Sequence, residues 1–551
     1  MPVGSEMRGE GLEGGVKTRG LKEEEAANAE KLGIQFKFNS GDYLQAIEYL
    51  QKVLTIRQEI RDRKGEASAR VNLGYVYSRS GDYVIARKYL DSALEITKEI
   101  GDKEGEANAY EKLGILHHVR RDYQKAVDYH ERALRLNQET GNKQGEAATY
   151  GNLGNVYHSL GDYQKAVDYH ERALRLNQET GNKQKEAATY GNLGNVYHSL
   201  DDYQRVVDYH ERALRLNQET GNKQGEAATY GNLGNVYHSL GDYQRAVDYH
   251  ERALRLNQET GNKQGEAAAY KNLGYAYHFL GDDQRAVDYH ERQLRLNQET
   301  GSKQEEAAAY VNAGVTYHSL GDYKRAVEYQ KRALRLNQET GNKQWEALAN
   351  TNLGIAYHSL GDDQRAVGYY ERALRLNQET GNKQLEAFAY RSLGIAYHSL
   401  GDYQRAVEYH ERVLRLNRET GNKQGEAATY ENLGNVYHSL GDYQRAVDYH
   451  ERALRINQET GNLQEEAATY GNLGIAYHSL GDYKRAVEYH ERALRLNQET
   501  GNKRGEALDY RNLGIAYHSL SDDQRAVEYH ARALRLYNQE TGNKQEEASA
   551  Y

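Results

Sequence analysis

The sequence contains no cysteine and a single proline, Pro2, in 551 residues. Without cysteine, the chain forms no disulfide and offers neither a thiolate metal ligand nor a cysteine nucleophile. Because proline breaks helix interiors, its absence after Pro2 favours a chain that is helical almost throughout. The sequence also lacks an N-x-[ST] sequon, the apolar core of a signal peptide, and any run of roughly 18 apolar residues. These absences predict a cytoplasmic protein without a membrane span.

The chain has no large excess of charge and no recognisable catalytic motif. It has 72 Lys and Arg residues against 81 Asp and Glu, for a net charge of −9. Nucleic-acid binders usually carry a basic stripe, so we expect no nucleic-acid partner. No P-loop, Gly-x-Ser-x-Gly or His-Glu-x-x-His motif is present, and each Glu or His recurs in equivalent copies. A catalytic site needs one asymmetric constellation, so we predict no enzyme activity, no cofactor and no metal site.

What the sequence does contain is a forty-residue repeat. Residues 151–184 and 231–264 differ only at Lys165 and Arg245. We expect residues 1–22 to be a disordered leader and residues 23–551 to be one repeat domain, since a fixed period indicates a stacked array. The predicted units are about 24–61, 64–101, 104–141, 144–181, 184–221, 224–261, 264–301, 304–341, 344–381, 384–421, 424–461, 464–501, 504–542 and a partial unit at 545–551.

One unit contains two predicted helices. Apolar residues at three- and four-residue spacings predict a helix from Lys143 to Leu160, and Gly161 can adopt the left-handed conformation that ends it. Asp162 is a candidate N-cap for a second helix that runs to about Thr180. Because a single hairpin cannot bury its apolar stripe, hairpins must stack on one another. We predict an all-α fold, a right-handed α-solenoid of about 13 helix-turn-helix hairpins.

The pattern Tyr150-x₂-Leu153-Gly154-x₂-Tyr157, followed by Ala166-x₃-His170 and Ala173, resembles a tetratricopeptide repeat. The period is 40 where 34 is usual, and Gln178 stands where that repeat normally has proline. His170 replaces an aromatic residue, and we expect it to be a packed core or interface residue. A forty-residue repeat with a Leu-Gly-Asn signature, as at Leu153–Asn155, is similar to the repeats of the Partner of Inscuteable family of G-protein-signalling modulators. This resemblance implies peptide binding in a concave groove, spindle orientation and a place at the cell cortex. That family also carries GoLoco motifs, which bind Gα subunits, and no such motif is present in this sequence.

The candidate binding residues lie on the first helix of each unit. We expect this helix to line the groove, and an Asn carboxamide there can both donate to and accept from an extended peptide. The alternative is that these residues only bond the neighbouring helix. The predicted groove residues are Asn72, Asn152, Asn155, His158, Asn192, Asn195, His198, Asn232, Asn235, His238, Asn272, Asn312, Asn352, Arg391, Asn432, Asn472 and Asn512.

His158 and its copies form a second row on this helix. Successive copies should lie roughly 10 Å apart, too far to share a metal ion. If the imidazoles are solvated, the groove should gain positive charge below about pH 6. We expect partner specificity to come from positions where the copies differ. Arg391 and Glu431 are examples at the position of Gly151, and Trp345 is either an exposed anchor or packed into a helix junction.

The sequence therefore predicts a non-enzymatic scaffold that binds extended peptide segments of partner proteins, such as a signalling or spindle-orientation adaptor. The alternative is a structural module that self-associates through its C-terminal end, or the repeat fragment of a larger multidomain sensor protein. Near-identical copies are also typical of a consensus-engineered array, although the irregular first three units count against that interpretation.

Overall fold

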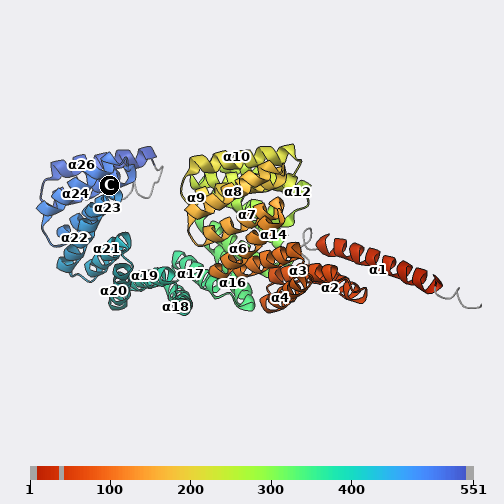
Figure 1. The fold of residues 1–551 in the computed structure, drawn as a ribbon. Coiled ribbons are helices and arrows are strands. Elements are labelled where there is room, and N and C mark those ends of the chain that lie inside the picture. Colours follow the sequence, from red (N-terminus) through yellow and green to blue (C-terminus); the bar gives the residue numbers. More distant parts are fainter. Residues whose placement is uncertain (1–8, 36–42, 541–551) are drawn as a thin grey trace, which may run out of the picture. The chain divides into compact units, whose positions relative to one another are not determined.

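In the computed structural model, the chain forms a series of antiparallel helical hairpins (Figure 1). The structure describes residues 9–35 and 43–540, and every regular element within these ranges is a helix. From α1 to α12 and from α14 to α26, helices that are neighbours along the chain pack against one another, both within hairpins and between them. The all-α architecture of stacked hairpins that the sequence predicts is confirmed.

Odd-numbered helices are the first helices of their hairpins, and even-numbered helices are the second. The first helices are α1 (Gly9–Gln35), α3 (Arg63–Ser80), α5 (Lys103–Val119), α7 (Lys143–Ser159), α9 (Lys183–His198), α11 (Lys223–Ser239), α13 (Lys263–Phe279), α15 (Lys303–Ser319), α17 (Lys343–Ser359), α19 (Lys383–Ser399), α21 (Lys423–Ser439), α23 (Leu463–Ser479) and α25 (Lys503–Ser519). The second helices are α2 (Tyr43–Glu59), α4 (Tyr83–Glu99), α6 (Tyr123–Thr140), α8 (Tyr163–Glu179), α10 (Tyr203–Glu219), α12 (Tyr243–Glu259), α14 (Asp283–Thr300), α16 (Tyr323–Thr340), α18 (Asp363–Glu379), α20 (Tyr403–Glu419), α22 (Tyr443–Thr460), α24 (Tyr483–Glu499) and α26 (Asp523–Glu540).

A residue with positive φ, which is glycine at most turns, and a capping residue separate consecutive helices. Gly161 ends the hairpin's first helix with φ of 78°, a left-handed conformation that favours glycine. The Asp162 carboxylate then accepts a hydrogen bond from the Lys165 N–H at 3.2 Å. The Asn142 side chain caps α7 in the same way, accepting from the Gly145 N–H at 3.0 Å. The bounds of α7 and α8 therefore agree with the predicted helices to within about one residue.

Small residues let the two helices of a hairpin approach closely. Leu153, Ala166 and Ala173 are almost completely buried. A Cβ added at Gly154 would lie only 2.6 Å from the Cε1 atom of His170. His170 is 1 % exposed, which confirms that this histidine is a core residue.

Two polar side chains at the end of α8 hold its hairpin to the next. Asn177 Nδ2, at the end of α8, donates to Thr189 Oγ1 on α9 at 3.1 Å. Its neighbour Gln178 stands where a tetratricopeptide-like repeat normally has proline. Gln178 donates from Nε2 to Glu186 Oε1 at 3.0 Å and to the Tyr190 hydroxyl at 3.1 Å. The residues that lengthen the repeat thus supply contacts between hairpins.

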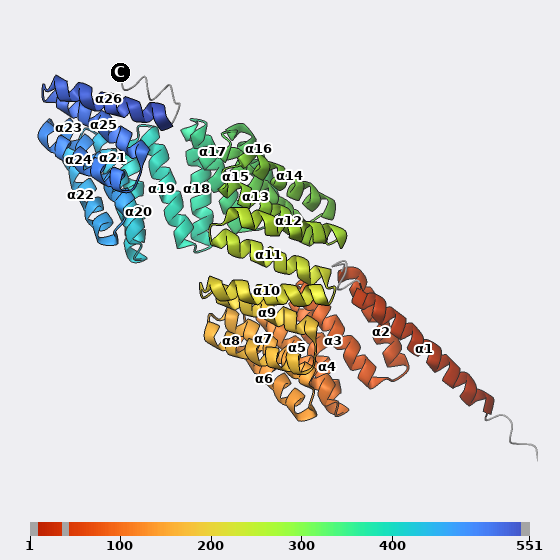
Figure 2. The ribbon, with the colours of Figure 1, turned by 90° about the horizontal axis from the view of Figure 1, so that it is seen from above.

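The chain divides into two compact units, Met1–Ala276 and Tyr277–Tyr551, with the division inside α13. Within each unit, first helices of successive hairpins also contact one another, as α7 contacts α9 and α15 contacts α17 (Figure 2). The outward side of the first helices therefore forms a shared surface wherever successive first helices are in contact. We call it the first-helix face and define it by Gly151, Asn152, Asn155, His158 and the residues at equivalent positions of other hairpins.

The N-terminal helix begins earlier than the sequence predicts. Helix α1 starts at Gly9, inside the segment expected to be a disordered leader up to residue 22. Extending an existing helix adds one hydrogen bond for each residue fixed, so the part of α1 that packs on α2 can propagate toward the N-terminus. Residues 1–8 and the predicted partial unit at 545–551 lie outside the described residues. Among the helices that the structure describes, none is long and apolar enough to cross a membrane.

Candidate functional site

The first-helix face presents amide and imidazole groups above a buried apolar layer. In α7, Asn152, Asn155 and His158 are half-buried, whereas Leu153 and Val156 beneath them are completely buried. A Cβ added at Gly151 would meet no atom within 4 Å. The same holds for Gly191 and Gly231. This part of the face leaves room for close approach by another backbone.

The predicted asparagine row divides into engaged and unengaged side chains. Within the described ranges, the side chains of Asn152, Asn192 and Asn232 have no hydrogen-bond partner. Three others bond to the preceding first helix: Asn72 to Glu30 at 3.4 Å, Asn272 to Asn235 at 3.1 Å and Asn472 to Glu431 at 2.7 Å. Asn312 and Asn512 are buried, and the remaining predicted residues Asn155, Asn195, Asn235, Asn352, Arg391 and Asn432 are half-buried or exposed. The alternative, a bond to the neighbouring helix, therefore holds at Asn72, Asn272 and Asn472, and peptide contact by the other residues stays a prediction.

The histidine row ties neighbouring first helices together. His158 Nε2 lies 2.8 Å from the Ser199 hydroxyl, one hairpin further along, and His198 lies 3.3 Å from that of Ser239. Burial lowers the pKa of His158. The same shift occurs at His118, His238, His318, His398, His438 and His478. The condition for charging near pH 6, a solvated imidazole, is therefore not met at these positions.

A pocket of about 420 Å³ opens on the first-helix face of the unit Tyr277–Tyr551. It is lined by Ile355, His358, Tyr370, Phe388, Arg391, Ser392, Ile395, Ala428, Glu431, Asn432 and Glu465. These residues come from four successive first helices, α17, α19, α21 and α23, and from the second helix α18. The Arg391 guanidinium lies 5.0 Å from the centre of the Phe388 ring. The pocket thus combines aliphatic, aromatic and charged side chains.

Glu431 forms one wall of this pocket and is held by two partners. Its Oε2 atom lies 2.8 Å from His450 Nδ1 and accepts from Asn472 Nδ2 at 2.7 Å. Helices α7, α9 and α11 have glycine where Glu431 stands, and the Nδ1 atoms of His170, His210 and His250 in their hairpins are buried without a partner. Glu431 therefore fixes a local polar cluster.

Sequence reasoning identified Arg391 and Glu431 but missed Phe388, Tyr370 and the two isoleucines of the pocket. Phe388 stands where α7 has Ala148, and Tyr370 where α8 has His170. Both residues differ from most copies of the repeat, and this difference could have identified them. The sequence prediction instead compared the copies at the position of Gly151. Trp345, the other candidate anchor, packs against a buried cluster that includes Leu294 and Ala349.

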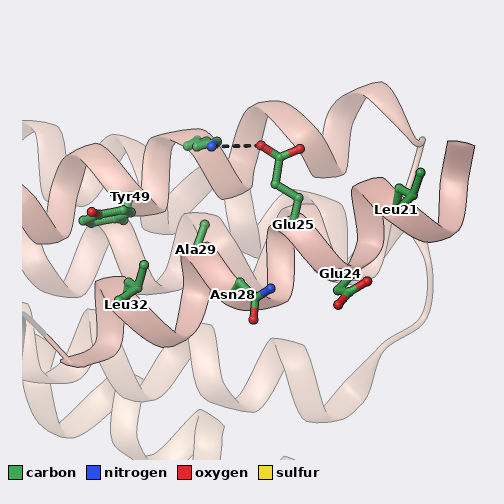
Figure 3. Close-up of a pocket in the computed structure, with 8 residues that line it drawn as sticks. Leu21, Glu24, Glu25, Asn28, Ala29, Leu32 and Tyr49 are labelled. Carbon is green, nitrogen blue, oxygen red and sulfur yellow. Dashed lines mark ion pairs between the residues drawn. The ribbon is translucent and has the colours of Figure 1, made fainter.

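A second pocket, of about 350 Å³, lies between α1 and α2 (Figure 3). Leu21, Leu32 and Tyr49 supply its apolar lining, and Glu25 forms an ion pair of 2.8 Å with Lys52 beside it. Both charged side chains are about half exposed, so this pair contributes little to stability. Across residues 9–35 and 43–540, no group of three or more His, Cys, Asp or Glu side chains could hold a metal ion.

A family profile described as tetratricopeptide repeat matches the chain at residues 25–99, 65–139, 145–219, 225–299, 305–379, 385–459 and 465–539. Together these stretches span most of the described residues. A search of curated proteins finds no match.

Several solved structures are similar to parts of the chain. One is BtubC from P. vanneervenii, with 27 % identity and a TM-score of 0.35 over 40 % of this chain and 91 % of that one. Another is a signal transduction ATPase with a tetratricopeptide repeat sensor from Pyrococcus horikoshii, with 15 % identity and a TM-score of 0.47 over 66 % of this chain and 55 % of that one. A third is the apo quorum sensor NprR from B. thuringiensis, with 19 % identity and a TM-score of 0.45 over 66 % of this chain and 99 % of that one. With TM-scores below 0.5, these likenesses carry no argument beyond the profile match.

Proposed function

Because the chain belongs to the tetratricopeptide repeat family, we propose that it is a non-enzymatic scaffold that binds an extended peptide segment of a partner protein along its first-helix face. The observation that carries this proposal is the row Asn152, Asn192 and Asn232, three half-buried carboxamides without an internal partner. Each follows a glycine whose missing Cβ leaves open space. A carboxamide can pair with both the N–H and the C=O of a peptide backbone, whatever side chains the peptide carries.

We also propose a narrower role, an adaptor in signalling such as spindle orientation at the cell cortex. The forty-residue period and the Leu-Gly-Asn signature at Leu153–Asn155 support this proposal through their similarity to the Partner of Inscuteable family. This proposal includes peptide binding and does not include binding of Gα subunits.

Affinity capture with two matched baits tests the scaffold proposal. One bait is the wild-type chain, and the other carries Asn152→Ala, Asn192→Ala and Asn232→Ala. A third bait, with the exposed second-helix residues Gln164, Gln204 and Gln244 changed to Ala, controls for loss of polar surface. We expect partners to be lost only from the asparagine variant. Recovery of the same proteins by the wild-type chain and the asparagine variant would rule out this use of the face.

A further inference from the structure

The position of Asn155 changes chemical character along the chain. Helices α7, α9 and α11 carry asparagine there, whereas most first helices of the unit Tyr277–Tyr551 carry a β-branched aliphatic residue. These residues are Val315, Ile355, Ile395, Ile475 and Ile515. All but the half-buried Ile355 are between 36 % and 43 % exposed. Single exposed aliphatic residues are ordinary on a surface, but a row at one equivalent position indicates an interaction site.

The row passes through the pocket of about 420 Å³ on the first-helix face. Ile355 and Ile395 line the same pocket of about 420 Å³ as Phe388 and Tyr370. Ring and aliphatic surfaces therefore converge on a space that is large enough for one apolar side chain of a ligand. Interface energy concentrates where such an anchor fills a pocket.

The charges around this pocket are not balanced. Arg391 is exposed, and its guanidinium has no ion pair among the residues that the structure describes. In the nearby Glu431 carboxylate, Oε2 lies 2.8 Å from His450 Nδ1 and accepts from Asn472, whereas Oε1 has no partner among the described residues. Glu465 is exposed on the first turn of α23, further along the same pocket. An acidic group of a ligand is therefore attracted beside Arg391 and repelled beside Glu465.

The spacing of the hairpins sets the register of a ligand. Packed helices lie about 8–10 Å apart, and Ile355 on α17 and Ile395 on α19 line the same pocket. A polyproline II segment rises about 3.1 Å for each residue with three residues per turn, so every third side chain returns to the same side after about 9 Å. One apolar ligand residue in every three can therefore meet successive members of the aliphatic row.

Resting on the proposed peptide-binding function, we propose that the first-helix face around α17 and α19 binds a polyproline II-like peptide segment. This segment carries a large apolar residue at every third position and one acidic residue beside Arg391. The aliphatic row supplies affinity, and Arg391 supplies the preference for the acid.

Three synthetic peptides test this proposal by fluorescence anisotropy with the full chain. The first, acetyl-LPSLPDLPSL-amide with a fluorescent label, has the proposed register and acid. In the second, the acid is replaced by its amide, giving LPSLPNLPSL. The third, LLPSPDSPLL, has the same composition in a different register. We expect the first peptide to bind about fivefold more tightly than the second and about tenfold more tightly than the third.

Variants that copy other hairpins identify the site. Ile355→Asn with Ile395→Asn installs the residue of α7, and we expect at least a tenfold loss of affinity for the first two peptides alike. Arg391→Gly installs the residue that α7, α9 and α11 carry, and should abolish the preference for the acid, so that LPSLPDLPSL and LPSLPNLPSL bind equally well. Val527→Asn, a 69 % exposed aliphatic residue on second helix α26, should change neither value.

No detectable binding of the first peptide, equal binding of all three, or unchanged affinity in the isoleucine variant would overturn this inference. Those outcomes leave the scaffold proposal standing if the asparagine variant still loses its partners in affinity capture. Retained partners in that experiment count against the scaffold proposal itself, whatever the peptides do.

Discussion

Asp509 places a carboxylic acid where α7, α9, α11, α21 and α23 have threonine. It is 4 % exposed, and burial raises its pKa to about 7, although Asn497 Nδ2 donates to the carboxylate at 2.7 Å. An unfolded Asp has a pKa near 3.9. Because the folded pKa is the higher one, folding is most favourable at low pH for this group. The contribution of Asp509 to the free energy of unfolding is therefore largest at low pH, where the acid is neutral, and is lost as pH rises toward 7.

We therefore expect Asp509→Thr to stabilise α25. The gain should be roughly 2–4 kcal/mol at pH 8 and smaller at pH 5, because the wild-type acid is largely neutral there. Amide hydrogen exchange of α25, compared between variant and wild type at each pH, measures the free energy of local opening. Thr469→Asp is the matched reverse change and should destabilise α23. Equal protection of Asp509→Thr and wild type at pH 8 would contradict the prediction.

Two glycines of one helix should respond oppositely to alanine. A Cβ at Gly154 would press on the His170 ring, so we expect Gly154→Ala to cost about 1–3 kcal/mol. A Cβ at Gly151 meets open space, and alanine favours helix, so Gly151→Ala should gain up to about 1 kcal/mol. The urea midpoint of helix loss, followed by circular dichroism, checks both. If both variants shift the urea midpoint in the same direction, the close approach of the two helices is not the reason for glycine at position 154.

At the scale of the element, Gln178 helps to join the hairpin of α8 to the hairpin of α9. Gln178→Ala removes two hydrogen bonds between α8 and α9, which should cost about 1–2 kcal/mol at that interface. Hydrogen exchange should accelerate at the end of α8 and the start of α9.

The chain itself offers a control for this change. Arg418 replaces glutamine at the equivalent position, and its guanidinium donates to Glu426 at 3.0 Å and also contacts the Tyr430 hydroxyl. Gln178→Arg should therefore keep near wild-type protection. If it is as destabilising as Gln178→Ala, the contacts do not join the hairpins.

Local signals predicted the elements well, and contacts between elements poorly. Gly161 and Asp162 act within a few residues, so the sequence located the ends of α7 and α8. The bond between His158 and Ser199 joins residues 41 apart, and only the packing of first helices brings them together. The pocket around Phe388 needs five helices at once. Its residues were visible as departures from the repeat, but no local rule says that those departures converge.

At the scale of the whole molecule, one buried imidazole recurs in most second helices. Burial lowers the pKa of His130 to about 3 and those of His170, His210, His250, His410 and His490 to about 4. An unfolded histidine has a pKa near 6.5. Below that pH the unfolded chain binds protons that the folded core refuses, so each such hairpin loses stability as pH falls from about 6.5 to 4. The loss approaches roughly 3 kcal/mol for each buried histidine at the acid end of this range.

Because stability in a repeat array is a sum over hairpins and their interfaces, these losses accumulate along the chain. We expect helix content, followed by circular dichroism at 222 nm, to fall reversibly between about pH 6 and pH 4. Gln330 shows that glutamine fits this position, since its Nε2 donates to the Val311 carbonyl at 3.0 Å. Replacing His170, His210 and His250 together by glutamine should therefore move the acid midpoint to lower pH. The same change at the half-buried His158, His238 and His318 should move it less, because these imidazoles are less buried and their protonation differs less between the folded and unfolded states. Equal midpoints for wild type and the core variant would show that carboxylates, not the buried imidazoles, set the acid limit of this array.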